Sequence, residues 1–282
     1  MTAQPLQPLL TARSFLIFPG DDPRKRDRAL ASEADAVVLD LEDGVAGNAK
    51  DAARSGLAAF AAAPGAPARF VRVNDPLSDD GRRDLAALSD LPDSVHVVVP
   101  KARIESVERA AGLGRPLLAL VEDASGLRDA FELAAHPAVD ALALGSADLR
   151  ASLGLVPDGS GTELIYPRAQ LVVASSAAGI RSPIDGPCLA TRDDDAVERD
   201  TRAARSLGMR GKFCIHPQQV GAVHRALAPS PSELEQARRV LVEWERVLRE
   251  GRAVGVVDGV LVDLPVVARA QAVVNAMEGS EE

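Results

Sequence analysis

The sequence predicts a (β/α)8 barrel with a C-terminal helical extension. Eight short apolar runs recur along the first 228 residues, and each one ends in a polar or glycine-rich tip. Alanine-rich stretches of helical length, studded with charges, separate these runs. Apolar runs without strict alternation are typical of strands buried on both faces, as in a parallel sheet covered by helices. Eight such units in about 250 residues indicate a barrel whose functional groups lie at the C-terminal strand ends.

The eight predicted strands follow the chain in order. They are Ser14 to Gly20, Ala36 to Glu42, Arg69 to Asn74, His96 to Lys101, Leu117 to Glu122, Ala141 to Gly145, Ser182 to Gly186 and Gly211 to His216. Helices are expected between them, and the acidic run Asp193 to Asp195 is interpreted as a solvated loop after the seventh strand.

A different pattern begins at residue 229. Ser230 and Glu233 form a capping box that predicts a helix ending at Gly251. Asp258-Gly259 is a hairpin-turn signal, and a last helix is expected over residues 264–277. The predicted domains are therefore a barrel, 1–228, and an extension, 229–282, that packs on its own barrel or on a neighbouring subunit.

Composition narrows the function classes. The chain has 282 residues, of which 46% are hydrophobic, so it can bury a large core. A net charge of -9 and 3% aromatic residues argue against a nucleic-acid partner. The two cysteines form no framework pattern, and neither a signal peptide nor an apolar span of about 20 residues is visible. We expect a soluble cytoplasmic protein that binds a small molecule, with no membrane partner.

Two acids occupy neighbouring strand tips. Glu122 ends the fifth strand and Asp148 lies just beyond the sixth. Tips of adjacent parallel strands lie about 4.8 Å apart, so the two carboxylates can converge on one ion. Paired carboxylates without His or Cys suit a hard cation such as Mg²⁺. The alternative for each acid is a helix N-cap.

Basic side chains occur at the third and fourth tips. Arg72 is expected to face the barrel mouth, where its planar fork suits a carboxylate or an oxyanion. A structural ion pair with Asp40 or Glu42 is the alternative for Arg72. Lys101 is a second anion-binding candidate, and Glu42 is kept as a catalytic candidate.

Taken together, these tips resemble the citrate lyase beta subunit-like family of the HpcH/HpaI aldolase superfamily. The matching segments run in order along almost the whole chain: Arg13-Ser14 through Pro19-Gly20, Val38 to Asp43, Val71 to Asn74, Val99 to Lys101, Val121-Glu122 with Gly126, Leu144-Gly145 with Asp148-Leu149, Ile184-Asp185, Gly208 with Gly211-Lys212, Ile215 to Gln218, and Val262-Asp263 with Pro265.

The resemblance implies a Mg²⁺-dependent barrel that makes or breaks a carbon-carbon bond in a 3-hydroxyacyl thioester, usually of coenzyme A. Glu122 and Asp148 match the metal ligands, Arg72 matches an arginine that contacts substrate, and Asp263 matches an acid in a C-terminal segment that closes the active site. That segment often belongs to a neighbouring subunit, so a homo-oligomer, trimer or hexamer, is expected. Without the resemblance, the residues around Asp263 are better interpreted as placing it at the N-cap of the last helix.

The substrate-binding candidates of the site are Arg72, Lys101, Arg13 and Gly145. Two positions depart from the family pattern: Asp123 stands where a small Thr or Ser is common, and Arg150 opens a stretch that is often more acidic. An extra charge beside the metal, as at Asp123, could alter the geometry of the ligands or the choice of substrate.

The leading hypothesis is a lyase acting on a malyl-CoA or citramalyl-CoA type of thioester. One rival is a metal-dependent aldolase that acts on 2-keto acids without a thioester. The other is a non-catalytic ligand-binding or assembly subunit that keeps the fold.

Overall fold

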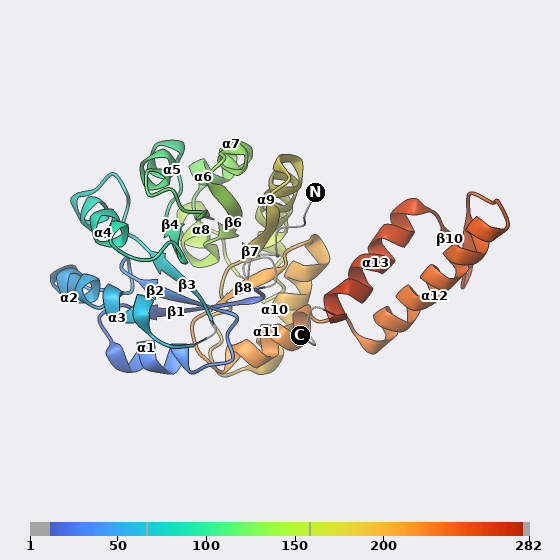
Figure 1. Cartoon of the computed structure of the whole chain (residues 1–282), viewed down its shortest axis with the longest axis horizontal. Coiled ribbons are helices and arrows are strands. Elements are labelled where there is room, and N and C mark those ends of the chain that lie inside the picture. Colours follow the sequence, from blue (N-terminus) through green and yellow to red (C-terminus); the bar gives the residue numbers. More distant parts are fainter. Residues whose placement is uncertain (1–11, 66, 158, 279–282) are drawn as a thin grey trace. The chain divides into compact units, whose positions relative to one another are not determined.

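A computed structural model describes residues 12–65, 67–157 and 159–278. The chain divides into two compact units, with the boundary in the sequence between Leu227 and Ala228. The first unit is a closed barrel of eight parallel strands in sequence order, ringed by helices (Figure 1). Each strand pairs with the next along the chain, and β8 pairs with β1. The predicted (β/α)8 barrel is confirmed.

All eight predicted apolar runs form strands. Their bounds are β1 Ser14–Pro19, β2 Ala36–Asp40, β3 Ala68–Arg72, β4 Val95–Val99, β5 Leu117–Val121, β6 Val139–Leu144, β7 Arg181–Asp185 and β8 Gly211–Cys214. The helices of this unit are α1 Pro23–Leu30, α2 Lys50–Ser55, α3 Leu57–Ala62, α4 Asp79–Ser89, α5 Ile104–Ala111, α6 Ala124–Arg128, α7 Ala130–Ala135, α8 Ser146–Leu153, α9 Ile165–Ala178, α10 Asp194–Leu207 and α11 Gln219–Leu227, with short 3-10 turns η2 Gly47–Ala49 and η3 Thr162–Leu164.

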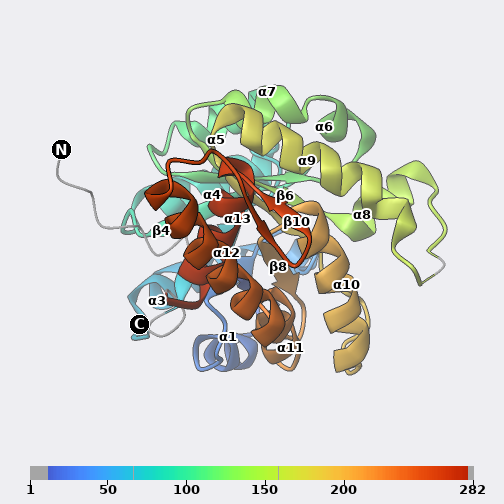
Figure 2. The same ribbon diagram turned by 90° about the vertical axis from the view of Figure 1, so that its right-hand side faces the viewer.

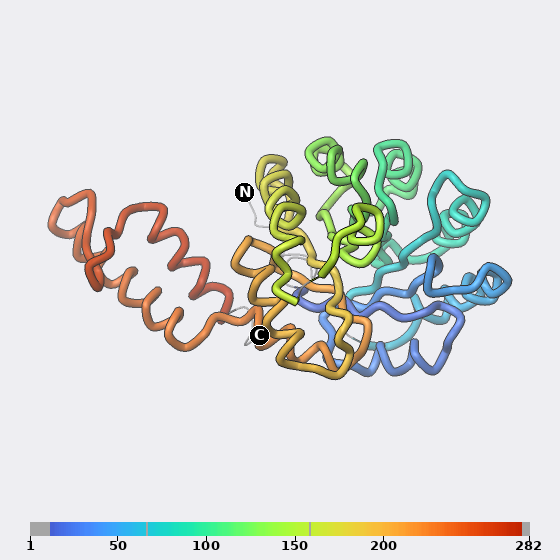
Figure 3. The backbone as a smooth tube through the Cα atoms, turned by 180° about the vertical axis from the view of Figure 1, so that it is seen from behind, coloured from blue at the N-terminus to red at the C-terminus, as the bar shows by residue number. Residues whose placement is uncertain are grey.

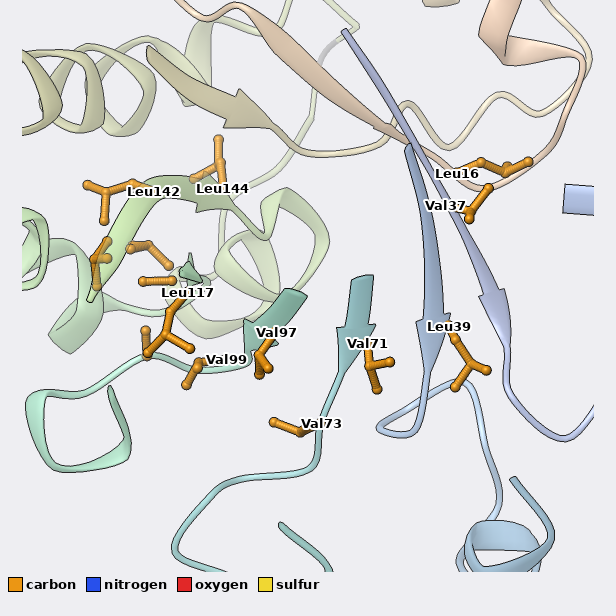
Figure 4. Packing of buried hydrophobic residues seen from close by; sticks show 14 of the residues in the cluster. Leu16, Val37, Leu39, Val71, Val73, Val97, Val99, Leu117, Leu142 and Leu144 are labelled. Atoms are coloured by element: carbon orange, nitrogen blue, oxygen red, sulfur yellow. The ribbon is translucent and has the colours of Figure 1, made fainter. Parts of the chain in front are cut away.

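Alternate strand residues serve two cores. One set points between the strands and the helices, and Figure 4 shows such residues along neighbouring strands, for example Val37, Val71 and Val97. The other set fills the barrel interior and includes Phe15 and Phe70, whose ring centroids are 5.4 Å apart. The same alternation turns the last residues of several strands toward the barrel mouth.

The outer helices pack in neighbouring pairs. Helix α9 lies beside α7, as Figure 2 shows, and α10 contacts α11. The acidic run after β7 was predicted to be a loop, and this is wrong. Asp193 caps α10 by accepting a hydrogen bond from Ala196 N, and the next two acids form the first helical turn, where the helix dipole favours negative charge.

The second unit is an antiparallel helix pair, α12 Pro231–Arg249 and α13 Leu264–Glu278, joined by the hairpin β9 Gly255–Val257 and β10 Val260–Val262 (Figure 3). The predicted capping box is present: Ser230 and Glu233 exchange hydrogen bonds with each other's backbone N–H groups. Asp258 and Gly259 both have positive φ, as the expected turn requires.

A small apolar cluster holds this unit together and includes Ala237, Val240, Val262 and Ala270. Across the residues described in both units, no helix is both long and apolar enough to cross a membrane.

Candidate active site

The ends of β2 and β3 bring Asp40 and Arg72 together. The two residues are register neighbours, and Arg72 Nε and Nη2 each lie 2.8 Å from a carboxylate oxygen of Asp40. Asp40 also accepts hydrogen bonds from the backbone N–H groups of Glu42 and Gly44. Burial opposes the charge of Arg72, but the hydrogen bonds that it donates to Asp40 outweigh this effect, and the pKa of Arg72 is raised. The guanidinium is therefore fixed in orientation and always charged.

Glu42 lies between two cations. Lys101 Nζ is 2.6 Å from Glu42 Oε1, and Arg72 Nη1 is 3.0 Å from Glu42 Oε2 without hydrogen-bond geometry. Lys101 also reaches the exposed carboxylate of Asp43 at 3.4 Å. Both bonded acids favour the protonated ammonium, so the pKa of Lys101 is raised against the opposing effect of burial. The structural ion pair considered for Arg72 is thus present, and Lys101 is ion-paired as well.

Lys50 was missed by the sequence analysis. Its Nζ donates to the backbone oxygens of Leu41 and Glu42, both at 2.6 Å, and to Asn74 Oδ1 at 2.8 Å. This fixes the loop that presents Glu42. No local signal predicts the contact, because Lys50 begins a short helix and looks like an ordinary surface residue.

Glu122 is the most perturbed acid of the site. Its Oε1 accepts the backbone N–H of Lys101 at 2.7 Å, whereas its Oε2 is buried and has no hydrogen-bond partner in the described part of the chain. Lys101 adopts a positive φ of 42°, which is uncommon for a residue with a side chain. Burial, followed by the charges of Glu42 and Asp148, raises the pKa of Glu122 to about 8.

Asp148 completes the acidic pair. It lies in the first turn of α8 with an exposed side chain, close enough to Glu122 for its charge to act on that carboxyl group. Gly145 explains how Glu122 fits between β5 and β6. A Cβ at position 145 would lie 2.4 Å from Glu122 Cβ and 2.6 Å from Oε2, so a larger residue would displace the carboxylate.

These residues fit a hard divalent cation. The buried Oε2 of Glu122 lacks a partner, and a cation would also relieve the repulsion between Glu122 and its acidic neighbours. Within the described residues, no group of three or more His, Cys, Asp or Glu side chains is arranged to hold a metal. Two carboxylates leave coordination positions for water and substrate oxygens, which suits Mg²⁺.

Asp123 is bonded to groups other than the candidate metal ligands. Its Oδ1 accepts the backbone N–H of Gly126 at 2.9 Å as the N-cap of α6, and its Oδ2 is 2.5 Å from Arg103 Nη2. The carboxylate is therefore used by a helix end and an ion pair. Arg150 is similarly engaged with Glu163 at 2.8 Å.

Arg13 is not brought to this site. It precedes β1, at the opposite end from the strand tips, where its Nε lies 3.3 Å from Asp35. In a parallel barrel, residues before a strand and residues after it lie on opposite faces, so the substrate-binding prediction for Arg13 is corrected.

Asp263 belongs to the second unit, and there it acts as a helix cap. Its side chain accepts the backbone N–H of Val266 at 3.3 Å, and its backbone oxygen accepts that of Val267. This local geometry matches the interpretation of Asp263 as the N-cap of the last helix.

Comparison with known proteins places the chain in a family. The sequence profile of the HpcH/HpaI aldolase/citrate lyase family matches residues 13–217, so the chain belongs to that family. It is 33% identical to a (3S)-malyl-CoA thioesterase of Cereibacter sphaeroides over 89% of each chain. It is 31% identical to an L-malyl-CoA/beta-methylmalyl-CoA lyase of the same species, covering 98% of this chain and 97% of the relative.

A solved structure is also similar over nearly the full length. CitE of Mycobacterium tuberculosis, in complex with magnesium, acetoacetate and coenzyme A, superposes with a TM-score of 0.82 at 33% identity, covering 95% of this chain and 98% of that one. The resemblance to citrate lyase beta subunit-like proteins is confirmed.

Proposed function

We propose that this protein is a Mg²⁺-dependent carbon-carbon lyase that cleaves, or forms, a 3-hydroxyacyl-CoA thioester of the malyl-CoA or citramalyl-CoA type. The observation that carries the proposal is the buried, unpartnered Oε2 of Glu122, which lies near Asp148 at the same strand ends as Arg72. Similarity to a malyl-CoA lyase and to a CitE that binds magnesium and coenzyme A supports the choice of substrate class.

Glu122 and Asp148 are proposed to hold the cation. Bound Mg²⁺ would supply Lewis-acid chemistry, acidifying the substrate hydroxyl group and stabilising the keto product. Transfer of the hydroxyl proton to water would turn the hydroxyl carbon into the carbonyl of the keto acid. The electron pair of the broken carbon-carbon bond would remain on the other fragment as a thioester enolate. Arg72, held in place by Asp40, would donate hydrogen bonds to the enolate oxygen.

Lys101 and Glu42 are proposed to position these groups. Lys101 orients Glu122 through its backbone N–H and neutralises Glu42 through its ammonium group. Glu42 in turn helps to hold the Arg72 guanidinium at the strand ends. Gly145 supports the site by leaving room for the Glu122 side chain.

Asp263 is proposed to return a proton to the enolate carbon, a role that rests on the family resemblance. The acid would come from the same chain or from a neighbouring copy in a homo-oligomer. Mixing Glu122→Gln and Asp263→Asn variants separates these cases. Recovered turnover in the mixture indicates a donor from a neighbouring copy, whereas two inactive variants that stay inactive together indicate a donor from the same chain.

A second candidate activity is thioester hydrolysis, which yields the free 3-hydroxy acid and CoA from the same substrates. The 33% identity to a (3S)-malyl-CoA thioesterase favours it. Free thiol is released by hydrolysis but not by carbon-carbon cleavage, so a thiol reagent distinguishes the two reactions.

The test is product analysis with malyl-CoA and citramalyl-CoA, in Mg²⁺ and in EDTA. The lyase proposal predicts metal-dependent release of acyl-CoA and keto acid, and loss of both in Glu122→Gln. Prompt thiol release without keto acid would favour the thioesterase. Cleavage of free hydroxy-keto acids but not thioesters would favour the aldolase rival, and inactivity on every substrate would favour a non-catalytic subunit.

A further inference from the structure

A cavity lies at the opposite end of the barrel from Glu122. Its volume is about 290 Å³, and it is bordered by residues that begin their strands, among them His96 near the start of β4 and Arg181 as the first residue of β7. Phe15, Phe70 and Leu118 form apolar walls. Ala141 keeps the space open because its side chain is small. The size is close to the lower end of ordinary small-molecule pockets.

Two polar atoms on the lining residues are unsatisfied. Arg181 Nε lies 3.0 Å from Asp140 Oδ2, but its Nη1 is buried and makes no hydrogen bond within residues 12–278 as described. His96 Nδ1 is also buried and makes no hydrogen bond to the residues that the structure describes. The centroid of its imidazole ring lies 5.2 Å from that of the Phe70 ring. Buried polar groups normally have a partner, so both atoms indicate an occupant that supplies one.

The lining carries excess positive charge. Its charged residues are Asp140, Arg181 and Arg210. Arg210 donates to the backbone oxygens of Arg205 and Met209, and burial together with Arg205 lowers its pKa. His96 is neutral near pH 7, because burial and the nearby cations Arg181 and Arg115 lower its pKa to about 4. The lining thus contains one carboxylate, two guanidinium groups and an imidazole that adds no charge.

We propose that this cavity is a second small-molecule site, specific for an organic monocarboxylate with a compact apolar body. The carboxylate would pair with Arg181 Nη1, accept a hydrogen bond from the Nδ1–H tautomer of His96 and approach Arg210. The apolar body would pack against Phe15, Phe70 and Leu118. The site is separate from the proposed lyase centre, and its test requires no turnover.

Benzoate is a suitable probe because it combines a carboxylate with a flat apolar ring. Binding to the full-length protein is measured by calorimetry and saturation-transfer NMR in EDTA, so that no metal recruits the carboxylate elsewhere. We expect saturable binding with a Kd of about a millimolar, as for other small fragments. Benzamide, which has the same shape without the charge, and inorganic phosphate, which lacks the ring, should each bind at least tenfold more weakly.

Two variants locate the binding. Asp140→Asn/Arg181→Met removes both members of one ion pair, so no buried charge is left alone, and should weaken benzoate at least tenfold. Ala141→Leu fills the cavity without altering charge and should have the same effect. Glu122→Gln, at the other end of the barrel, is the matched control and should bind benzoate like the original protein. Circular dichroism verifies the fold of each variant, and Ala141→Leu decides the question if the double variant does not fold.

The proposal fails if benzoate shows no saturable binding or binds no better than benzamide. It also fails if a folded Ala141→Leu variant retains full affinity, or if Glu122→Gln is the variant that loses it. Binding seen only after deletion of residues 1–11 would overturn the proposal as well, because the full chain would then not possess the site.

Discussion

Two charged clusters of the barrel each contain an acid and a base that are register neighbours on adjacent strands, and they differ in the residues that surround this pair. At the mouth, Asp40 and Arg72 are register neighbours on β2 and β3, and Glu42, Lys101 and Glu122 surround them. We refer to these five residues as the mouth cluster. On the other side of the barrel, Asp185 and Lys212 are register neighbours on β7 and β8 but contact residues of the outer helices.

In the second cluster every charge has an opposite partner. Lys212 lies 2.5 Å from Asp185 and 2.7 Å from Asp200, and Arg168 bonds the same two acids at 2.9 and 2.6 Å. We refer to these four residues as the β7–β8 network. Two cations and two anions balance, and the side chains of Arg168, Asp185 and Lys212 are at most 1% exposed.

The mouth cluster lacks this balance. Its three buried carboxylates, with Asp148 nearby, face two cations, and Glu122 keeps one buried oxygen without a partner. The difference teaches that burial of charge alone does not identify a functional site. The β7–β8 network is neutral and fully bonded, so loss of one member would leave a buried charge unpaired, whereas the mouth cluster has negative charge in excess and an unpartnered carboxylate oxygen.

The largest expected effect is on stability, in the β7–β8 network. Lys212→Met should lower the free energy of unfolding by about 3–5 kcal/mol, because Asp185 loses a partner while fully buried. Urea unfolding checks this. The double variant Asp185→Asn/Lys212→Met should recover much of the loss, since Arg168 and Asp200 remain paired. A single variant as stable as the original protein would refute the structural role.

A substitution in the mouth cluster should lower activity rather than stability. Glu122→Gln should reduce metal-dependent turnover by about 10²- to 10³-fold, because a charged ligand to the cation is lost. Its metal-free stability at pH 8 should be equal or higher, since the variant has no carboxylate to ionise in a buried site. Steady-state kinetics and thermal unfolding test both parts. A large stability loss with turnover retained would make Glu122 structural.

Metal affinity should depend on pH with a definite sign. The pKa of Glu122 is about 8 in the folded chain, compared with 4.5 ordinarily. In the metal-free protein, protonation of Glu122 therefore stabilises the folded state relative to the unfolded state fully below pH 4.5, and this stabilisation is lost as the pH rises toward 8. Mg²⁺ must displace the Glu122 proton, and its affinity should therefore rise up to about tenfold per pH unit between pH 6 and 8. Calorimetry in two buffers should detect proton release. An affinity that does not change across this range would contradict the assignment.

The smallest effect is expected at Asp123. Asn is an equally good N-cap, so Asp123→Asn should cost less than about 1 kcal/mol, mainly through the lost Arg103 ion pair. Mg²⁺ affinity should change less than about twofold. A tenfold change would mean that the charge of Asp123 acts on the cation after all.

The sequence predicted the barrel and most of the mouth cluster because both depend on local patterns. Apolar runs mark the strands, and the residue after each run must lie near the mouth, which placed Glu122 and Arg72 correctly. The same reasoning could not assign Arg13, since the family motif includes the start of β1 as well as its end.

The missed features depend on contacts between distant residues. Lys50 donates to backbone oxygens eight and nine residues away and to the side chain of Asn74, after the end of β3. The sequence around Lys50 contains no pattern that predicts these contacts. Arg168 and Asp200 come from two helices and meet only after folding. The cavity at the start of the strands likewise exists only because small and large interior residues are combined across the barrel.

Binding of Mn²⁺, a spectroscopic substitute for Mg²⁺ with similar oxygen ligands, tests the central claim most directly. Electron paramagnetic resonance would follow Mn²⁺ titrated into the original protein, Glu122→Gln, Asp148→Asn and, as the control, the double variant Asp185→Asn/Lys212→Met. We predict one ion per chain in the original protein and the control, and weak or no binding in either mouth variant. Unchanged binding in Glu122→Gln and Asp148→Asn would contradict the account.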